Sequence, residues 1–252
     1  MRRILVLAPH PDDEVVGCAV SLRRAVRRGA TARVLFLTSG GPARDVLWPW
    51  QRSRHPATVT RRRKEASAAA ARLGIEIAGF SEWPTRTLKD HLAAAEKRIR
   101  TAAAEASEVW VPAWEGAHQD HDVANWLATR LDCPVLEFAE YSFAGGVRSN
   151  EFAGGGDAFA LTPEEAEWKR GLLALYASEA GNLRHIRVAQ EALRPLPRHD
   201  YTRPPHQGPL FYQRFQWVPF RHPRIDFTRP EEVCAVLAEA AAAQRARSAT
   251  SS

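Results

Sequence analysis

The sequence predicts an α/β fold built on a mostly parallel β-sheet, and three observations support this prediction. The chain has 252 residues, of which 45% are hydrophobic and 25% are charged, so it is long and apolar enough to bury a substantial core. Short apolar runs typical of strands buried on both faces alternate with segments of helical periodicity. The first run, residues 4–8, is followed by a loop, a helix and a second apolar run, which is the order of a right-handed crossover between parallel strands.

The first half of the chain repeats this alternation. Strands are expected at residues 4–8, 33–38, 75–80, 109–113 and 135–142. Helices are expected after the loop at 12–17 as far as residue 28, over 60–73 and over 88–107, with a loop at 41–59. Gly29 and Gly74 follow the first two helices, and glycine commonly ends a helix because it tolerates a left-handed backbone.

The second half of the chain is less regular. Residues 159–161 predict a short strand. The segment 162–165, Thr-Pro-Glu-Glu, has the N-cap threonine, the proline and the glutamate of a capping box, and predicts a helix that runs to about residue 180. Residues 194–230 are rich in proline, arginine and aromatic side chains and are interpreted as a segment that wraps over the domain, whereas 231–246 predict an alanine-rich helix.

We expect residues 1–252 to form one domain of a cytoplasmic protein. No apolar run approaches the ~18 residues of a membrane span, and the N-terminal run ends at Ala8, where a polar segment replaces the rest of a signal peptide. The three cysteines are widely spaced and provide neither a disulfide framework nor a paired-cysteine metal site. The net charge of +6 comes from arginines spread along the chain, so no nucleic-acid partner is expected, whereas a homo-oligomer is left open.

Two polar clusters follow predicted strands. The first, residues 10–14 (His-Pro-Asp-Asp-Glu), comes directly after the strand at 4–8. The second, residues 115–122 (Glu-Gly-Ala-His-Gln-Asp-His-Asp), follows the strand at 109–113. Ligands bind at the carboxyl ends of the strands in open α/β sheets, so both clusters are expected at one edge of the sheet. Imidazoles and carboxylates together there predict a site for a divalent metal ion.

A set of His10, Asp13 and His121 would offer two nitrogens and one carboxylate, which suits catalytic zinc with an open position for water, although another divalent ion such as Fe²⁺ also fits. Zinc polarises a carbonyl and activates water, so hydrolysis of an amide or ester is the expected chemistry. Asp12 cannot easily share the ion with its neighbour, and is expected to act as general acid/base, first accepting the proton of the water.

Three further side chains receive supporting roles. His118, three residues before His121, is expected to stabilise the oxyanion of the tetrahedral intermediate. Asp120 is expected to hold the tautomer of His118, and Glu14 to act behind the residues that bind the metal.

Both clusters resemble motifs of a known family. Residues 9–14, Pro-His-Pro-Asp-Asp-Glu, resemble the HPDDE signature of the LmbE-like (PIG-L) N-deacetylases, and residues 118–121, His-Gln-Asp-His, resemble the family's second motif, HxDH. The resemblance also includes Thr-Ser-Gly-Gly at 38–41 and an R-x-x-E helix that contains residues 62–65, and it spans about residues 3–125.

This resemblance implies a Rossmann-like three-layer sandwich that removes an N-acyl group, usually N-acetyl, from an amino sugar such as an N-acetylglucosamine derivative or glycoconjugate. It implies the same zinc ligands and the same roles for Asp12 and His118 as the residues themselves suggest. It further implies that Arg62 contacts substrate hydroxyls or a phosphate. Many members carry an Asp-Gly pair that helps to hold the sugar, whereas residues 83–88 here read Trp-Pro-Thr-Arg-Thr-Leu, which leaves the identity of the substrate open.

The long loop at 41–59 supplies two more candidate substrate contacts. Trp48 could stack on a sugar ring or, alternatively, pin the loop to the body of the protein. Arg54 could meet an anionic substrate or simply be solvated. Two other functions also remain open: an amidase for a bulkier N-acyl group or a thiol conjugate, and a non-catalytic protein of the same fold that binds a sugar or nucleotide.

Overall fold

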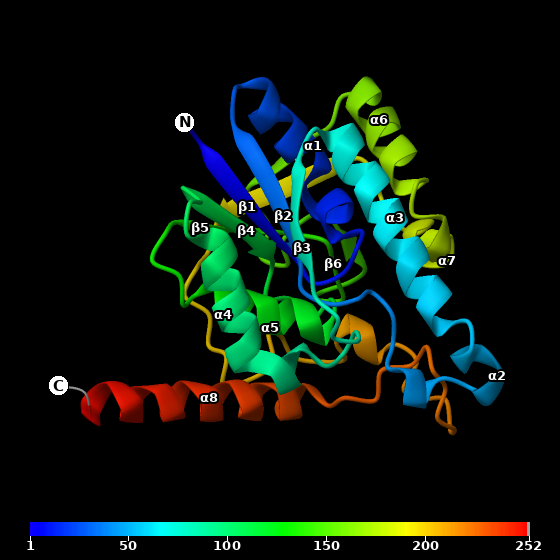
Figure 1. The fold of residues 1–252 in the computed structure, drawn as a ribbon, viewed down its shortest axis with the longest axis vertical. Helices are drawn as coiled ribbons and strands as arrows, with labels where there is room; N and C mark the ends of the chain where they lie inside the picture. The colour runs from blue at the N-terminus through cyan, green and yellow to red at the C-terminus, as the bar shows by residue number, and fades with distance from the viewer. Residues whose placement is uncertain (251–252) are drawn as a thin grey trace.

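A seven-stranded sheet forms the centre of the molecule in a computed structural model that describes the backbone of residues 1–250 and the side chains of residues 1–246 (Figure 1). The strand order is β3-β2-β1-β4-β5-β9-β8. The strands of this sheet are β1 (Arg3–Ala8), β2 (Thr31–Phe36), β3 (Glu76–Phe80), β4 (Glu108–Pro112), β5 (Val135–Phe138), β8 (Ala158–Ala160) and β9 (Gln190–Pro195). The first five are parallel, whereas β9 and β8 are antiparallel additions at one side. The predicted α/β fold with a mostly parallel sheet is therefore confirmed.

The central strand β1 is buried on both faces because alternate side chains enter two separate cores. Ile4 and Val6 pack against one face of the sheet, and Leu5 and Leu7 pack against the other. Both sets are at most 2% exposed. A continuous apolar run is the pattern expected for a strand covered by helices on both sides.

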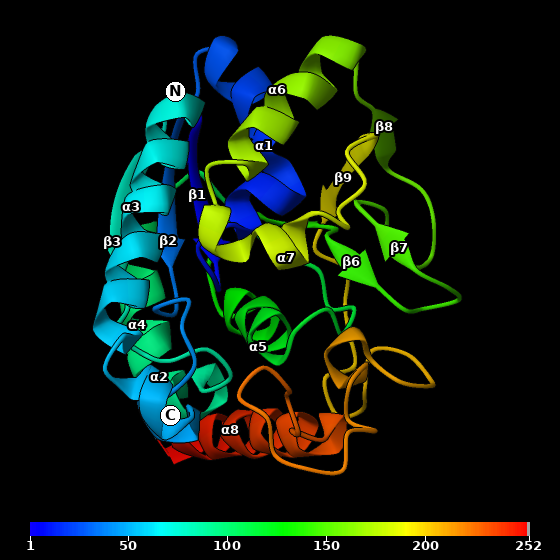
Figure 2. The ribbon, with the colours of Figure 1, turned by 90° about the vertical axis from the view of Figure 1, so that its right-hand side faces the viewer.

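Helices cover both faces of the sheet. The main helices are α1 (Asp13–Arg27), α3 (His55–Leu73), α4 (Leu92–Ala103), α5 (Gln119–Ala128), α6 (Pro163–Leu173) and α8 (Pro230–Thr250). Helices α1, α3 and α6 contribute to the core on one face, and α4, α5 and α8 to the core on the other. Figure 2 shows α1 and α6 side by side, and both views show α8 lying below α5. This is a layered arrangement in which helices cover both faces of the sheet, with α6 packed on α1 and α8 packed on α5.

Several element boundaries differ from the sequence predictions. Helix α3 begins at His55, and the preceding segment contains a 3₁₀ turn (Arg44–Val46) and the short helix α2 (Pro49–Arg52), so residues 41–59 are not one irregular loop. The helix expected over 88–107 is a 3₁₀ turn (Leu88–His91) followed by α4. The capping box at Thr162 and Glu165 is present, with both reciprocal hydrogen bonds, but α6 ends at Leu173.

The helix predicted as far as residue 180 continues only as a 3₁₀ turn (Ala177–Glu179) and α7 (Ala180–Leu183). At the break, the buried Tyr176 turns inward and donates a hydrogen bond from its hydroxyl to Glu14. The strand expected over 135–142 also divides. After Phe138 the chain leaves β5, and β6 (Tyr141–Ser142) pairs with β7 (Arg148–Ser149) in a separate two-stranded sheet.

Strand β9 was not predicted, because its sequence contains charged residues at positions that the fold buries. Glu191 is fully buried and Arg194 is partly buried. Glu191 receives hydrogen bonds from Lys169 and from α1, and Arg194 pairs with Glu137 of β5. These partners are distant in the sequence, so the local pattern does not resemble a strand. The 34 residues after β9 and before α8 are irregular apart from a 3₁₀ turn at Phe211–Gln213.

Across the described residues, none of the helices combines the length and apolar character required to cross a membrane.

Replacement of Gly17 by alanine is expected to destabilise the protein by about 1 to 3 kcal/mol, because a well-packed core resists added volume. A Cβ atom on Gly17 would lie 2.1 Å from Cδ2 of Phe138. This clash should outweigh the ~1 kcal/mol that alanine gains over glycine inside a helix. The free energy of unfolding measured in urea tests this.

Gly171→Ala is the matched control, since Gly171 also lies within a helix. The nearest atom to its added Cβ would be Nη2 of Arg72 at an ordinary 3.6 Å, so this variant should be as stable as wild type or more stable. Equal stability of the two variants would contradict the packing argument at Gly17.

Candidate metal centre

The two polar clusters meet because the strands that precede them are neighbours. Strands β1 and β4 pair in parallel, with Leu5 opposite Val109 and Val6 opposite Trp110. The first cluster leaves the carboxyl end of β1 and continues into α1, and the second leaves β4 and continues into α5. The predicted convergence at one edge of the sheet therefore follows from the strand order.

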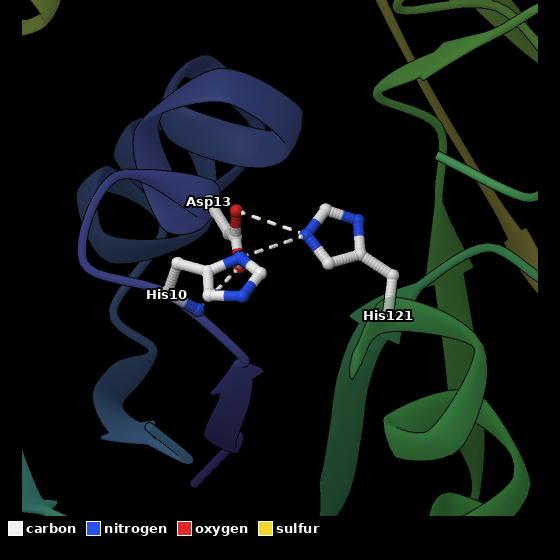
Figure 3. A group of neighbouring side chains, drawn as sticks. All are labelled: His10, Asp13 and His121. Carbon is white, nitrogen blue, oxygen red and sulfur yellow. Dashed lines mark hydrogen bonds and ion pairs between the residues drawn. The ribbon is translucent and has the colours of Figure 1, made fainter. Parts of the chain in front are cut away.

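His10, Asp13 and His121 form a compact group of buried donor atoms (Figure 3). Nε2 of His121 lies 3.2 Å from Oδ1 of Asp13 and 3.2 Å from Nδ1 of His10. Nδ1 of His10 lies 3.5 Å from Oδ2 of Asp13. Two imidazole nitrogens and one carboxylate, all within 4.8 Å of one another, match the donor set of a catalytic zinc site with an open position.

The electrostatics of this group also suit a cation. Burial disfavours the ionised Asp13, but the imidazoles of His121 and His10 outweigh this effect and hold the pKa of Asp13 well below its usual range. Burial alone would lower the pKa of His10. The neighbouring carboxylates Asp13 and Asp120 outweigh burial and raise the pKa of His10 to about 10. A metal ion must therefore displace a proton from His10, while Asp13 is already ionised.

Asp12 lies beside this group and does not belong to it. Its backbone has a φ of 137°, a left-handed conformation that a residue without special support rarely adopts. Its N–H donates to Oε2 of Glu14 at 3.2 Å, and its Oδ2 lies 3.5 Å from Nη2 of Arg62. Burial raises the pKa of Asp12 well above its usual value despite Arg62. A carboxylate with a raised pKa is a better proton acceptor than an ordinary aspartate.

The ring of His118 lies close to His10, with centroids 4.4 Å apart in an edge-on arrangement. Nδ1 of His118 accepts a hydrogen bond from the backbone N–H of Asp120 at 3.1 Å. Burial and the neighbouring His10 hold the pKa of His118 well below its usual value. The ring is therefore neutral, and its proton lies on Nε2, where it can be donated.

The carboxylate of Asp120 binds His10 instead of fixing His118. Its Oδ2 lies 3.0 Å from Nε2 of His10, compared with 3.6 Å from Nδ1 of His118. It also accepts the backbone N–H groups of Arg86 at 2.6 Å and Leu88 at 3.1 Å. Since its own backbone N–H fixes the tautomer of His118, its carboxylate is free to orient the other histidine.

Glu14 supports the loop from behind. Its two oxygens accept hydrogen bonds from the N–H of Asp12 and the hydroxyl of Tyr176. Burial raises its pKa to about 7. Glu14 thus contacts the backbone of Asp12 and does not enter the donor group, and its indirect role stays a prediction.

The three predicted substrate contacts lie at different depths. Arg62 is only 6% exposed and donates to the carbonyl of Pro11 at 2.9 Å while it also pairs with Glu179. Trp48 is half-buried, stacks on Trp50 and meets the edge of His222. Arg54 is exposed directly before α3. The structure thus places Trp48 and Arg54 at the N-terminal ends of helices, before α2 and before α3, and places Arg62 against the loop of Asp12.

Sequence reasoning missed Glu140. This residue follows β5, the neighbour of β4, and is 3% exposed beside the ring of His121. The available signal was weak: an acidic side chain directly after an apolar strand that ends at the same edge of the sheet. The signal was hidden because the strand was expected over 135–142 and so included Glu140, whereas β5 ends at Phe138.

A prediction of pH dependence concerns Glu115, which is 6% exposed and accepts the N–H of Ala153 at 2.6 Å. Burial raises the pKa of Glu115 to about 7, above that of an unfolded glutamate. Its contribution to stability is therefore largest at acidic pH and is lost as the pH rises to 7. Relative to wild type, Glu115→Gln should gain on the order of 2 kcal/mol between pH 5 and pH 8.

Urea unfolding of both proteins at the two pH values measures this difference. Glu167→Gln, at a side chain that is 76% exposed, is the control and should show no such gain. A pH-independent difference between Glu115→Gln and wild type would show that burial does not perturb Glu115.

The fold and the site together define a class: an α/β protein with a buried histidine and aspartate group, suited to a divalent metal, at the carboxyl edge of its sheet. The family model for GlcNAc-PI de-N-acetylase (PIG-L) matches residues 5–131, which contain both clusters. The chain belongs to this family of deacetylases, as its motifs suggested. No curated protein matches it.

Several solved structures share the fold. A deacetylase from the teicoplanin biosynthesis pathway is 22% identical, with a TM-score of 0.57, over 72% of this chain and 86% of the other. The N,N'-diacetylchitobiose deacetylase of Pyrococcus horikoshii is 15% identical, with a TM-score of 0.57, over 78% and 84%. The 4-carboxy-2-hydroxymuconate hydratase of Pseudomonas putida is 17% identical, with a TM-score of 0.52, over 79% and 98%. Because a hydratase shares the fold, the reaction must be argued from the site.

Proposed function

We propose that this protein is a metal-dependent hydrolase that removes an N-acetyl or related N-acyl group from an amino sugar, such as an N-acetylglucosamine derivative. The observation that carries the proposal is the buried group of His10, Asp13 and His121, with the carboxylate of Asp12 beside it but outside the donor group. A non-catalytic sugar- or nucleotide-binding protein has no need for a metal centre with a strained acid next to it. Membership of a deacetylase family points to the same reaction.

The donor set suits Zn²⁺, although Fe²⁺ or another divalent ion is compatible with two nitrogens and one oxygen. Zinc held by His10, Asp13 and His121 would supply a Lewis acid that lowers the pKa of water to ~7 and polarises the acyl carbonyl. Asp120 orients His10 through its carboxylate, so the ligand ring is held before any substrate arrives.

The residues around this centre supply the proton transfers and the charge stabilisation. Asp12 takes a proton from the attacking water and returns it to the leaving amine, and its raised pKa suits both steps. His118 donates its Nε2 proton to the oxyanion of the tetrahedral intermediate, because Nδ1 is already occupied by a backbone N–H. Arg62 and Glu14 hold the loop that places Asp12.

The segment around α2 favours an amino sugar that carries further groups as the substrate. Trp48 and Trp50 are stacked, and Trp50 is 68% exposed, so an aromatic platform is available to a sugar ring or aglycone. We propose that Arg54 contacts an anionic group on the substrate and that Arg62 contacts its hydroxyls or a phosphate. The similar structures include deacetylases named for teicoplanin biosynthesis and for diacetylchitobiose, both of which fit a glycoconjugate substrate.

Amine release from a panel of N-acylated amino sugars, with and without a phosphate or an aglycone, tests this proposal. The zinc-loaded protein should release amine from at least one N-acetylated member and prefer the anionic members. Full zinc loading without amine release from any member would overturn the proposal in favour of a binding protein. Turnover restricted to bulkier N-acyl groups or thiol conjugates would overturn the N-acetyl assignment and identify an amidase.

A further inference from the structure

Glu140 and His121 present buried polar atoms that face each other without a hydrogen bond. Glu140 is 3% exposed and His121 is completely buried. Among the described residues, neither carboxylate oxygen of Glu140 has a hydrogen-bond partner, and Nδ1 of His121 has none either. Buried polar groups are rarely left in this state, because each unmet hydrogen bond costs about 1 to 3 kcal/mol.

The two groups lie almost within reach of each other. Oε2 of Glu140 is 3.8 Å from Nδ1 of His121. The other nitrogen of His121, Nε2, faces Asp13 and His10, and Figure 3 shows Nδ1 on the opposite side of the ring, directed away from that group. A closure of less than 1 Å would form the hydrogen bond, since N–H···O bonds are normally 2.7 to 3.2 Å long.

The chemistry of a metal ligand decides where the proton of His121 lies. An imidazole that gives the lone pair of Nε2 to a metal is neutral and must carry its proton on Nδ1. That N–H then points at Glu140. A carboxylate in this position orients the ring and increases its basicity, which strengthens the bond to the metal.

Local packing also keeps Glu140 near His121. The backbone carbonyl of Glu140 accepts the N–H of Asn150 at 2.6 Å. Its Cγ packs against α1 at Gly17, where an added Cβ would come within 3.2 Å of it. Any residue larger than glycine at position 17 would therefore crowd the side chain that faces His121.

We propose that Glu140 is a positioning residue that accepts the Nδ1 proton of His121 and fixes this histidine as a ligand when the metal binds. The inference rests on the proposed function, because it requires His121 to hold a metal ion. It adds a carboxyl partner behind the histidine, on the side of the ring opposite to Asp13, and it gives the orphaned atoms of Glu140 a role.

The experiment measures zinc affinity by competition with a chelator in the full-length protein carrying Glu140→Gln or Glu140→Leu. Glutamine can still accept the proton but lacks the charge, so we expect about tenfold weaker binding, and up to about a hundredfold for leucine. The electronic spectrum of the Co²⁺-substituted protein should change in the leucine variant, since the orientation of His121 is no longer fixed.

The stability of the metal-free variants separates positioning from a structural role. A side chain that only supports the fold would cost stability when replaced. Removal of an unsatisfied buried carboxylate should instead leave the metal-free protein as stable as wild type or more stable. Unchanged zinc affinity in a folded Glu140→Leu protein would overturn the proposal.

Glu137→Gln is the matched control, because Glu137 lies in β5, the strand that directly precedes Glu140. Glu137 is also fully buried, but its oxygens are bound to Arg194, His199 and Asn125, away from His121. It should lose stability and keep the zinc affinity of wild type. If wild type bound neither zinc nor another divalent ion, both this inference and the proposed function would fail. If the Glu140 variants bound zinc more weakly than wild type, but wild type hydrolysed no amide, the proposed function alone would be refuted.

Discussion

Asp12→Asn should lower kcat for N-deacylation by about 10²- to 10⁴-fold, the usual contribution of a general acid/base, and leave the zinc content unchanged. Asparagine preserves the size of the side chain and can face Arg62, but its amide cannot accept the proton of the attacking water. The backbone N–H of residue 12 can still bind Glu14, so the loop should keep its conformation. Metal analysis and amine release on the same preparation measure both quantities.

Two further variants make this result specific. His121→Ala should lose bound zinc as well as activity, because it removes a nitrogen from the donor group. Asp132→Asn changes a side chain that is 98% exposed and should leave activity and metal content unaltered. Near-normal turnover by Asp12→Asn would refute the assignment of the acid/base, whereas loss of zinc from this variant would mean that Asp12 is itself a ligand.

Lys169→Met should reduce the free energy of unfolding by about 3 to 5 kcal/mol, because it leaves a buried carboxylate without its cation. The side chains of Lys169 and Glu191 are completely buried and 2.9 Å apart. Together they bridge a break in α1, where Cys18 has a non-helical φ of −144°.

The break exposes backbone groups that these two side chains satisfy. Nζ of Lys169 donates to the carbonyl of Val16 at 2.7 Å, before the break. The carboxylate of Glu191 accepts the N–H groups of Val20 and Ser21, each at 2.8 Å, after it. A cation at the end of one helical segment and an anion at the start of the next also complement the helix dipoles.

Urea unfolding measures this prediction, and a mutant cycle sharpens it. The double variant Lys169→Met with Glu191→Gln should lose less than the sum of the two single losses, because each single change leaves the other charge buried alone. Arg229→Ala removes an exposed ion pair with Glu232 and should cost less than about 1 kcal/mol. A cost equally small for Lys169→Met would show that the pair does not support α1.

Much of the candidate site could be predicted from the sequence because its residues lie in two short segments. Each segment directly follows an apolar strand, and neighbouring parallel strands bring their carboxyl ends together. The supporting roles were harder to predict. The carboxylate of Asp120 binds His10 because the chain folds back over more than a hundred residues, and no local spacing indicates which histidine it reaches. Arg62 meets the loop of Asp12 for the same reason.

The sequence by itself determined the parallel core of the sheet, the helices that end at glycine, the capping box of α6 and the family of the protein. Each of these is read from short segments, either one turn or cap or a series of short motifs and apolar runs along the chain, so no contact between distant residues has to be known. The tertiary structure alone decided the antiparallel strand β9, the early end of α6, the bridge across the break in α1 and the position of Glu140 behind His121. Each of these depends on buried polar groups whose partners are distant in the chain. Burial is tolerated there only because the folded protein supplies, or in the case of Glu140 nearly supplies, the matching hydrogen bond or charge.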